Sequence, residues 1–458
     1  MPELFPEPPE RTPATPGRVA VRIGLSVIAL VVGTFVLLLR VGGRSVLTTI
    51  WAEDRTVFLV QALAHPWRLF SSYAGYLELL PRLIAQLVSF LPLSDASAAF
   101  AISGAVIASA VAIFVFYASA GHVRLGWLRA LLAAAVLLLP VAPLEIADSG
   151  VNTPWYLLFA LFWAALWRPR GRGGMALAAL IAFLAGASSP MALAIAPLLA
   201  VRIVALPRLR EHAVTAGLAA GLLLQVPVVA SARQSRVSQL AGPGGTVDFV
   251  AHDVVLPALG WHLDWWLQSI VGRNGATLLV GCVLATVFCA IAVTQPARVR
   301  LLAGAALVCG LLLATAAATL SVWVTTDSVH FHIEPGSRYT TLPIFLMQAA
   351  VIVAVDNVAR RARDRVRSDD QAAAFGVTPW TGWVRARGAT VAVATLVLML
   401  SVGWVTDFRY GNGRAGGAPW APIANRWLAD CQRVPQGVIR VPSLEVGFVV
   451  IRCTSLRR

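Results

Sequence analysis

The chain has 458 residues, of which 58% are hydrophobic and only 13% are charged, and its mean hydropathy is +0.74. Soluble domains carry roughly 45–50% apolar residues, so this composition excludes an ordinary soluble fold. The formal net charge of +15 would suit nucleic acid or anionic lipid, but the basic residues lie in short connectors between apolar runs. Membrane topology explains such a placement, so no nucleic acid partner is expected. The sequence predicts a polytopic protein of the lipid bilayer.

The N-terminal segment, residues 1–21, is rich in proline and polar side chains and does not look like a cleavable signal peptide. A segment of this composition cannot bury enough apolar surface to fold by itself. We therefore expect residues 1–21 to form a disordered cytoplasmic tail.

Residues 22–406 contain eleven apolar runs, which predict an all-α domain of about eleven transmembrane helices. A helical crossing takes about 20 residues, within a range of roughly 17–25. Three of the runs are shorter than a full crossing, so their ends are not fixed by the sequence. The runs cover residues 22–39, 98–120, 127–143, 155–167, 175–187, 190–205, 213–230, 277–294, 301–323, 340–357 and 388–406.

The connectors between these runs fall into an arginine-rich group and an arginine-poor group. Positive charges favour the cytoplasmic side of a membrane protein. Placing the arginine-rich connectors inside, among them the inner loop 358–387, predicts a multi-pass protein of the cell membrane with a cytoplasmic N-terminus and an external C-terminus. Three large elements then lie outside, namely the outer loops 40–97 and 231–276 and the tail 407–458.

The first outer loop, residues 40–97, contains two further apolar segments. Residues 76–93 are apolar enough for a span, but a span here would move every later connector to the side that the arginines disfavour. This segment also carries Glu78, Pro81 and Arg82. The pattern favours a membrane-parallel or re-entrant helix, with residues 55–70 as a similar companion.

The C-terminal tail, residues 407–458, ends in β-branched runs interrupted by proline and glycine, which predict a few strands. Cys431 and Cys453 lie in this tail, whereas the other three cysteines lie within apolar runs. If the tail faces an oxidising compartment, these two cysteines could pair. We expect a small external appendage that contains a Cys431–Cys453 disulfide.

Polar side chains gather in three places on the predicted outer face. A carboxylate at a membrane boundary is costly to desolvate, so it usually faces water, a partner or a substrate. A carboxylate that faces arginine side chains can take a proton from an acceptor hydroxyl, while the guanidinium groups neutralise the charge of a phosphate leaving group. The clusters are Glu53 and Asp54 with Tyr73, Tyr76, Glu78 and Arg82; Glu145 and Asp148 with Asn152; and Asp327, His330, His332 and Glu334 with Arg338 and Tyr339.

The segment WAEDRTVF, residues 51–58, places two carboxylates soon after the first apolar run. With the long outer loop and the number of spans, it resembles the GT-C superfamily of integral-membrane glycosyltransferases. Those enzymes carry an acidic motif after the first span that supplies the catalytic base, and they take sugars from polyprenyl-phosphate carriers at the outer face. The tract GSRYTTLP, residues 336–343, is similar to the Arg-Tyr position that many of them have before a late helix.

The resemblance implies an enzyme of the bacterial cell envelope that moves a sugar from a polyprenyl-phosphate-linked donor to a glycan, lipid or protein acceptor. Asp54 would be the general base, and Glu53 would assist or orient it. Arg338 and Arg82 would bind the donor phosphate. The candidates for binding substrate are Glu145, Asp148, Tyr73, Tyr76, Glu334 and Tyr339.

Simpler explanations exist for these residues. Glu53 and Asp54 could begin a solvated loop, and Arg338 could reach toward lipid headgroups from the end of a span. Glu145 and Asp148 could form the polar rim of a helix hairpin.

No cofactor is indicated by the sequence. His330 and His332 lack a third ligand, so we expect no metal site, although a divalent cation remains compatible with the chemistry. The alternative function is non-enzymatic: a flippase or transporter of lipid-linked sugars, or a membrane subunit of an envelope complex. A transporter would place ionisable groups near mid-membrane. Most acids here cluster at one face instead, which favours surface chemistry.

Overall fold

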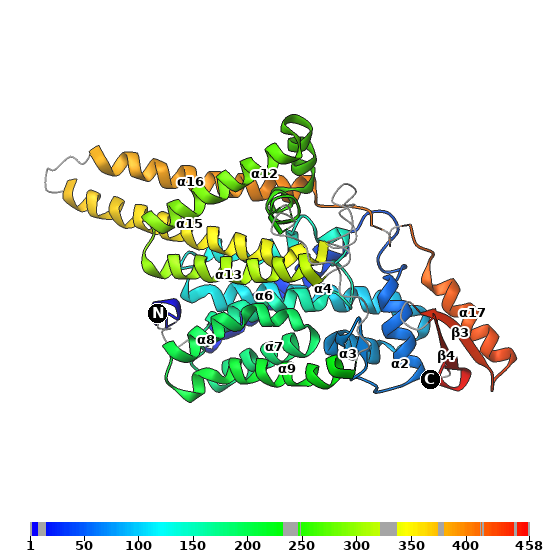
Figure 1. Cartoon of the computed structure of the whole chain (residues 1–458). Coiled ribbons are helices and arrows are strands. Elements are labelled where there is room, and N and C mark those ends of the chain that lie inside the picture. The colour runs from blue at the N-terminus through cyan, green and yellow to red at the C-terminus, as the bar shows by residue number, and fades with distance from the viewer. Residues whose placement is uncertain are drawn as a thin grey trace.

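The computed structural model describes residues 2–7, 15–231, 246, 247, 249–320, 337–373, 380–412, 414, 416–443 and 447–456. Over these residues the chain is an all-α membrane protein with two small sheets, as the composition predicts (Figure 1). The longer helices are α1 (Pro16–Leu38), α4 (Ala96–Ala118), α5 (Gly126–Leu138), α6 (Thr153–Leu166), α7 (Arg172–Ser188), α8 (Ala196–Ala205), α9 (Ala213–Ser231), α12 (Trp261–Thr294), α13 (Ala297–Leu320), α15 (Ser337–Ala373), α16 (Trp380–Thr406) and α17 (Trp420–Arg433).

Seven helices among the described residues are long and apolar enough to cross a membrane. They are Pro16–Leu38, Leu93–Gly121, Gly126–Leu144, Leu209–Ala230, Trp265–Thr294, Ala297–Ala318 and Ser337–Asp364. The four other expected spans coincide with shorter apolar helical segments, namely Thr153–Leu166, Arg172–Ser188, Pro190–Ala205 and Val393–Thr406, the last of which is part of α16. The total of about eleven crossings, and the side on which each terminus lies, therefore stay predictions.

Helix α6 forms the centre of the bundle, because all of its residues from Thr153 to Leu166 are buried. It contacts α4, α7 and α15, and its apolar side chains belong to the largest hydrophobic core. Helices α7 and α9 approach each other closely at Gly217, where a Cβ atom would come within 2.2 Å of the Ala179 carbonyl oxygen. Glycine at this position therefore sets the spacing of the two helices.

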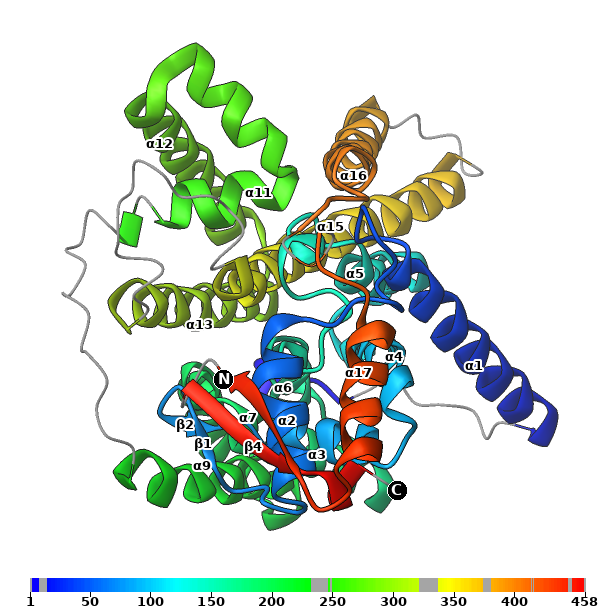
Figure 2. The ribbon, with the colours of Figure 1, turned by 90° about the vertical axis from the view of Figure 1, so that its right-hand side faces the viewer.

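The first outer loop folds into short elements beside one end of the bundle. The π-helix η2 (Asp54–Leu59) continues directly into α2 (Val60–Ala64), and α3 (Leu79–Val88) follows after a small hairpin of β1 (Ser72–Tyr73) and β2 (Tyr76–Leu77). Helix α2 lies across the direction of the long helices (Figures 1 and 2). This arrangement agrees with two helical segments in the loop, while their position relative to a bilayer stays a prediction.

The tail folds as helix α17 followed by an antiparallel hairpin of β3 (Val438–Ser443) and β4 (Gly447–Arg452), paired from Val438↔Arg452 to Ser443↔Gly447. A disulfide joins Cys431 in α17 to Cys453 after β4, with 5.1 Å between their Cα atoms. The hairpin packs against η2 and α2, where Trp420 and Ile451 are fully buried in a shared hydrophobic core. The tail therefore packs against the first outer loop and shares a hydrophobic core with it.

The expectation of a disordered tail over residues 1–21 is wrong for part of that segment. A turn of 3-10 helix covers Pro2–Leu4, and helix α1 already begins at Pro16. Phe5 is fully buried at the end of the bundle, its carbonyl oxygen accepts from Arg168 at 3.2 Å, and the Arg202 guanidinium lies 5.6 Å from its ring. Leu4 and Phe5 are buried in the main hydrophobic core, so the bundle provides the apolar partners that this polar segment lacks alone.

Two loop boundaries also differ from the sequence-based expectation. Helix α12 begins at Trp261, inside the expected outer loop 231–276, and contains a kink at Gly272. Helix α15 continues to Ala373, inside the expected inner loop 358–387. Both helices extend past their apolar runs, and hydropathy locates only the apolar part of a helix.

Candidate active site

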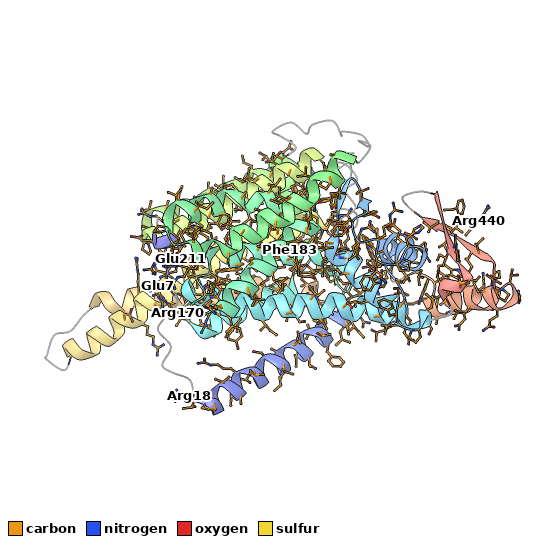
Figure 3. All side chains as sticks on the ribbon, turned by 90° about the horizontal axis from the view of Figure 1, so that it is seen from below. Glu7, Arg18, Arg170, Phe183, Glu211 and Arg440 are labelled. Carbon is orange, nitrogen blue, oxygen red and sulfur yellow. A yellow bond between two sulfur atoms is a disulfide. The ribbon has the colours of Figure 1, made fainter. Side chains whose placement is uncertain are left out.

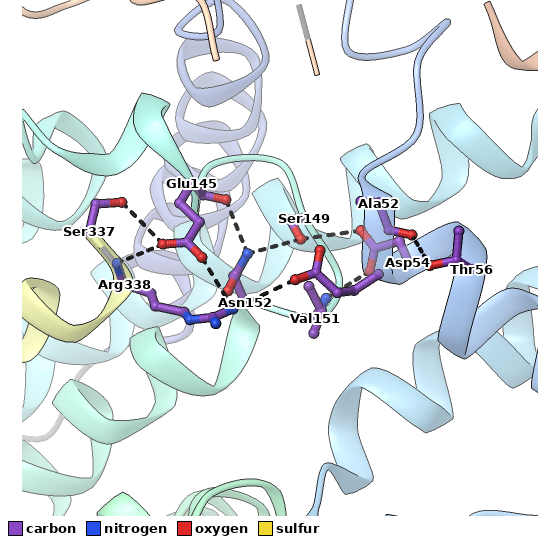
Figure 4. A network of polar contacts seen from close by, with 10 residues as sticks. Ala52, Asp54, Thr56, Glu145, Ser149, Val151, Asn152, Ser337 and Arg338 are labelled. Carbon is purple, nitrogen blue, oxygen red and sulfur yellow. Dashed lines mark hydrogen bonds and ion pairs between the residues drawn. The ribbon is translucent and has the colours of Figure 1, made fainter. Parts of the chain in front are cut away.

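The two adjacent carboxylates of the first outer loop have different surroundings. The Asp54 side chain is fully buried. Its oxygens accept hydrogen bonds from the backbone N–H of Val151 at 2.8 Å, the backbone N–H of Gly150 at 3.0 Å and the hydroxyl of Ser149 at 3.2 Å (Figure 4). Glu53 lies one position earlier and keeps 15% of its side chain exposed. Helical geometry turns neighbouring side chains by about 100°, so the pair faces two directions.

The loop that holds Asp54 depends on a glycine. A Cβ atom at Gly150 would lie 2.8 Å from the Phe100 ring and 3.1 Å from an oxygen of Asp54. Asp148, two residues earlier, has a left-handed backbone conformation with φ of 58°. The hydroxyl of Thr153 then donates to the Gly150 carbonyl at 2.7 Å where helix α6 begins. The loop and Asp54 therefore fix each other's position.

Arg338 lies between two carboxylates at the start of helix α15. One of its guanidinium nitrogens lies 3.1 Å from the Glu145 carboxylate and 3.8 Å from the Glu53 carboxylate. Glu145 also accepts from the backbone N–H of Arg338 at 3.1 Å and from the hydroxyl of Ser337 at 3.3 Å. A carboxylate at this place satisfies a free N–H of the first helical turn and interacts favourably with the helix dipole.

A continuous polar network connects Asp54 with Glu145 and Arg338 (Figure 4). The side-chain amide of Asn152 donates to the Glu145 carbonyl at 3.0 Å and to the Ser149 hydroxyl at 3.3 Å. Ser149 in turn donates to Asp54. The structure thereby brings together residues from the first outer loop, from the loop before α6 and from the start of α15.

Aromatic rings and a third carboxyl complete the surroundings of Arg338. Its guanidinium lies 5.3 Å from the Tyr339 ring, which packs edge-on against Trp155 with centroids 5.2 Å apart. Glu78 is buried, and its side chain hydrogen-bonds to the hydroxyl of Tyr76. The sequence analysis placed Glu78 in a polar cluster but gave it no role in the site. The feature that could have indicated such a role is the presence of a single acid within an apolar segment.

The pKa values of these acids follow from their burial. Burial raises the pKa of Asp54 to about 7, against the opposing effects of the Arg414 charge and the two backbone N–H groups. Burial also raises the pKa of Glu53, with the Arg338 charge opposing the rise. For Glu78 burial raises the pKa to about 8. Groups with a pKa near neutrality suit proton transfer.

Other residues that the sequence singled out lie at the edge of this site or outside the described residues. Arg82 donates to the side-chain oxygen of Gln61 at 2.8 Å and to the Ser72 carbonyl at 3.1 Å, so these contacts orient its guanidinium within the loop. The ring of Tyr73 packs against Phe58 in the same loop. The cluster with Asp327, His330, His332 and Glu334 lies outside the described residues.

The tail contributes a buried cation that the sequence analysis did not single out. Arg414 donates to the backbone carbonyls of Asp148, Thr49 and Val46. Its charge acts on both Asp54 and Asp148. Burial raises the pKa of Asp148 to about 7, and neither of its side-chain oxygens has a hydrogen-bond partner among the described residues. The sequence feature that could have indicated a role for Arg414 is its position as an isolated arginine in the glycine-rich tract GNGRAGG.

Within the described ranges, no group of three or more His, Cys, Asp or Glu side chains is arranged to hold a metal ion. The carboxylates of Glu53 and Glu145 meet the Arg338 guanidinium instead. The arrangement can bind an anion at the arginine and hold a carboxylate next to it.

No protein-family model matches the chain. A search of curated proteins also finds no match. Among solved structures, the chain is similar to the crystal structure of ArnT from Cupriavidus metallidurans in the apo state, with a TM-score of 0.41 and 14% sequence identity over 91% of this chain and 80% of that one. The helices and the composition together establish that the chain is an all-α polytopic membrane protein.

Proposed function

We propose that the protein is a glycosyltransferase of the GT-C type, which moves a sugar from a polyprenyl-phosphate-linked donor to an acceptor hydroxyl of the cell envelope. The observation that carries this proposal is the position of Glu53, 3.8 Å from the Arg338 guanidinium at one end of an apolar bundle. A transfer of this kind needs a carboxylate and a cation at the same place, together with access for a lipid.

Arg338 would bind the phosphate that leaves with the lipid carrier. A guanidinium presents a planar fork of donors that matches phosphate oxygens. Stabilising the charge that develops on this leaving group lowers the barrier of the transfer. The Glu145 carboxylate contacts both the guanidinium and the backbone N–H of Arg338, so the cation is oriented before the donor binds.

The geometry supports Glu53 as the general base. Its side chain is partly exposed and faces the arginine, whereas Asp54 is enclosed and already accepts three hydrogen bonds. A base must reach the acceptor proton within about 2.6–3.2 Å, directly or through one water. Asp54 would then hold the loop before α6. The assignment of Asp54 as base, which the sequence favoured, stays the competing prediction.

The reaction needs no redox step. The acceptor oxygen attacks the anomeric carbon of the donor sugar, the bond to the phosphate oxygen breaks, and the lipid phosphate leaves with that electron pair. The acceptor proton passes to the carboxylate base. Tyr76, Tyr339 and Trp155 line the surroundings of Arg338 and would contact the sugar or the lipid phosphate.

The test is transfer by the purified full chain with a panel of radiolabelled polyprenyl-phosphate sugars and an envelope extract as acceptor. The proposal expects a labelled product with at least one donor, and loss of that product in the Glu53→Gln variant. If the wild-type chain instead moves the labelled lipid across a vesicle membrane without forming product, it is a flippase and the proposal is wrong.

A further inference from the structure

A buried glutamine in helix α9 bonds to the first outer loop and to α7. The side-chain oxygen of Gln225 accepts from the backbone N–H of Leu77 at 2.8 Å, and its side-chain nitrogen donates to the carbonyls of Leu77 and Gly186, each at 3.0 Å. Gly186 lies in the last turn of α7, where helix carbonyls have no partner within the helix. Polar side chains in apolar helices commonly link neighbouring segments in this way. Gln225 thus joins α9, α7 and strand β2.

The backbone groups of Leu77 need this partner. Among the described residues β2 pairs only with β1, with Tyr73 opposite Tyr76 at the turn and Ser72 opposite Leu77. In a hairpin with a two-residue turn, the residues that close the turn bond to each other, and the backbone groups of the next pair point outward. Leu77 is fully buried, so water cannot reach these groups. Gln225 occupies the place that a third strand would take.

Helix α3 receives its N-terminal cap from α7 and not from its own sequence. Glu78 holds the N-cap position of α3, where a polar side chain commonly accepts from an N–H of the first turn, yet Glu78 makes no such bond. The hydroxyl of Ser188 accepts from the Leu80 N–H at 3.0 Å instead. The Glu78 side chain hydrogen-bonds to the hydroxyl of Tyr76. Because Ser188 caps α3, the carboxyl of Glu78 can turn toward Tyr76.

Apolar packing supports these hydrogen bonds. A hydrophobic cluster joins the loop to α7 and α9, and Phe183 of α7, labelled in Figure 3, packs against it. At Gly221 a Cβ atom would collide with the Phe183 carbonyl oxygen, so the backbones of α7 and α9 are in contact about one turn before Gln225. The buried members of the cluster are Leu77, Leu79, Ala187 and Val228. The loop segment 77–80 is therefore held on the two helices by both polar and apolar contacts.

This segment adjoins the candidate active site. Tyr76 and Glu78 both lie within range of the Arg338 charge, and the Glu53 charge acts on Glu78 as well. The Tyr76 side chain is half-buried, whereas that of Glu78 is buried. Of these two residues, Tyr76 is therefore the one that can touch a bound donor, and Glu78 acts on the donor through Tyr76.

We propose that Gln225 and Ser188 are positioning residues of the donor site. By holding residues 77–80 they let Glu78 orient the Tyr76 hydroxyl beside Arg338, where this hydroxyl hydrogen-bonds to the donor sugar. The inference rests on the proposed function, because it places the donor at Arg338. Groups that bind a substrate need neighbours that lock their geometry before the substrate arrives. Gln225 and Ser188 supply this support from α9 and α7.

The test combines hydrogen–deuterium exchange with donor binding on the purified full chain. Gln225→Leu keeps the approximate size of the side chain but removes its donor and its acceptor. Exchange of the peptide that covers residues 72–80 should become about tenfold faster or more, since two hydrogen bonds to Leu77 are lost. Affinity for the polyprenyl-phosphate sugar that the wild type binds most tightly should fall by about the same factor as in Tyr76→Phe. In the double variant the loss should not exceed the larger single loss, because both changes act on one contact.

Ser188→Ala is the second variant, because it removes only one hydroxyl and so decides the question even if Gln225→Leu fails to fold. It should speed exchange of the same peptide and weaken donor binding, each by a smaller factor than Gln225→Leu. Val214→Ala is the control. Val214 is buried in the first turn of α9, roughly 16 Å along the helix from Gln225. This variant should lower the melting temperature but leave donor affinity and the exchange of residues 72–80 unchanged.

Unchanged exchange in both Gln225→Leu and Ser188→Ala would overturn the proposal, as would additive losses of affinity in the double variant. Faster exchange with unchanged donor affinity would make the two residues structural only, and an equal loss of affinity in Val214→Ala would reduce the effect to general destabilisation; either result also overturns it. Failure of the proposed function has a different signature. The wild-type chain would then bind no donor of the panel, which removes the donor site from the inference, while faster exchange in Gln225→Leu would still show that Gln225 holds the loop.

Discussion

The carboxylate of Glu53 lies 3.8 Å from the guanidinium of Arg338, although the two residues come from the first outer loop and from the start of α15. Its neighbour Asp54 turns away and is held by the backbone of Gly150 and Val151. The acidic pair thus divides into one group at the arginine and one group that fixes a loop. This division leads to distinct expectations for each residue.

Glu53→Gln should lower the transfer rate by about 10²–10⁴, because the amide keeps the size of the side chain but cannot accept the acceptor proton. Donor binding and the melting temperature should stay close to those of the wild type. Initial rates with a labelled donor, together with a donor-binding titration, check this. Wild-type turnover in Glu53→Gln, combined with a stable but inactive Asp54→Asn variant, would make Asp54 the base.

Asp54→Asn should instead lower both the stability of the protein and the rate of transfer. The amide of asparagine can present only one acceptor oxygen to the N–H groups of Gly150 and Val151 and the Ser149 hydroxyl. Leaving a buried donor without a partner costs about 1–3 kcal/mol. Thermal unfolding in detergent should show a lower midpoint for this variant than for Glu53→Gln. Equal midpoints for the two variants would argue against a structural role for Asp54.

Arg338→Lys should weaken donor binding and lower the rate. Lysine keeps the charge but presents a single ammonium group in place of the planar fork, so it cannot bind phosphate in a bidentate manner or hold Glu53 and Glu145 in the same geometry. A binding titration with a polyprenyl-phosphate sugar, run beside a rate assay, separates the two effects. Unchanged affinity for the donor would remove Arg338 from the phosphate site.

Arg414→Gln should lower stability strongly, because the buried Asp54 and Asp148 lose the cation that acts on both. Removing one partner of a buried charge arrangement costs about 3–5 kcal/mol. Arg440→Gln is the control, since Arg440 is exposed on β3 and its loss should change the melting temperature little. Similar midpoints for both variants would show that the tail does not support the site.

Cys431→Ser should lower stability by about 2–4 kcal/mol, since the disulfide to Cys453 closes a loop over a sequence separation of 22. We expect the loss of stability to affect mainly the hairpin β3–β4, which packs against α2 next to the candidate site. Cys282→Ser, at an exposed free cysteine, is the control. Peptide mapping without reducing agent should find the disulfide in native membranes; two free thiols there would contradict an external tail.

Stability should fall as the pH rises from about 5 to 8, in part because of Asp148. Its folded pKa of about 7 lies above the ordinary value of 3.8, so the folded state binds the proton more tightly. The resulting stabilisation is complete below the ordinary pKa and is lost as the pH rises through 7. Asp148→Asn should therefore flatten the dependence of the melting temperature on pH. Asp430→Asn, at an exposed residue, should keep the wild-type slope.

The sequence by itself determined the class of protein and drew attention to several residues of the candidate site. Apolar runs of about bilayer length require helices, because only a helix or a closed barrel satisfies backbone groups in lipid. The acidic pair stood out because carboxylates are rare and costly beside such runs. Both signals are local in the chain, and so composition and spacing were sufficient to find them.

Only the tertiary structure decided which residues meet. Nothing in the spacing of Glu53, Glu145 and Arg338 predicts one network, because the contact depends on how α6 and α15 pack. The burial of Asp54, the effect of the Arg414 charge on it and the hydrogen bond from Arg414 to the Asp148 carbonyl are also results of packing between distant segments. Charge and hydropathy are properties of single residues, whereas burial, pKa and hydrogen bonding depend on neighbours that the fold supplies.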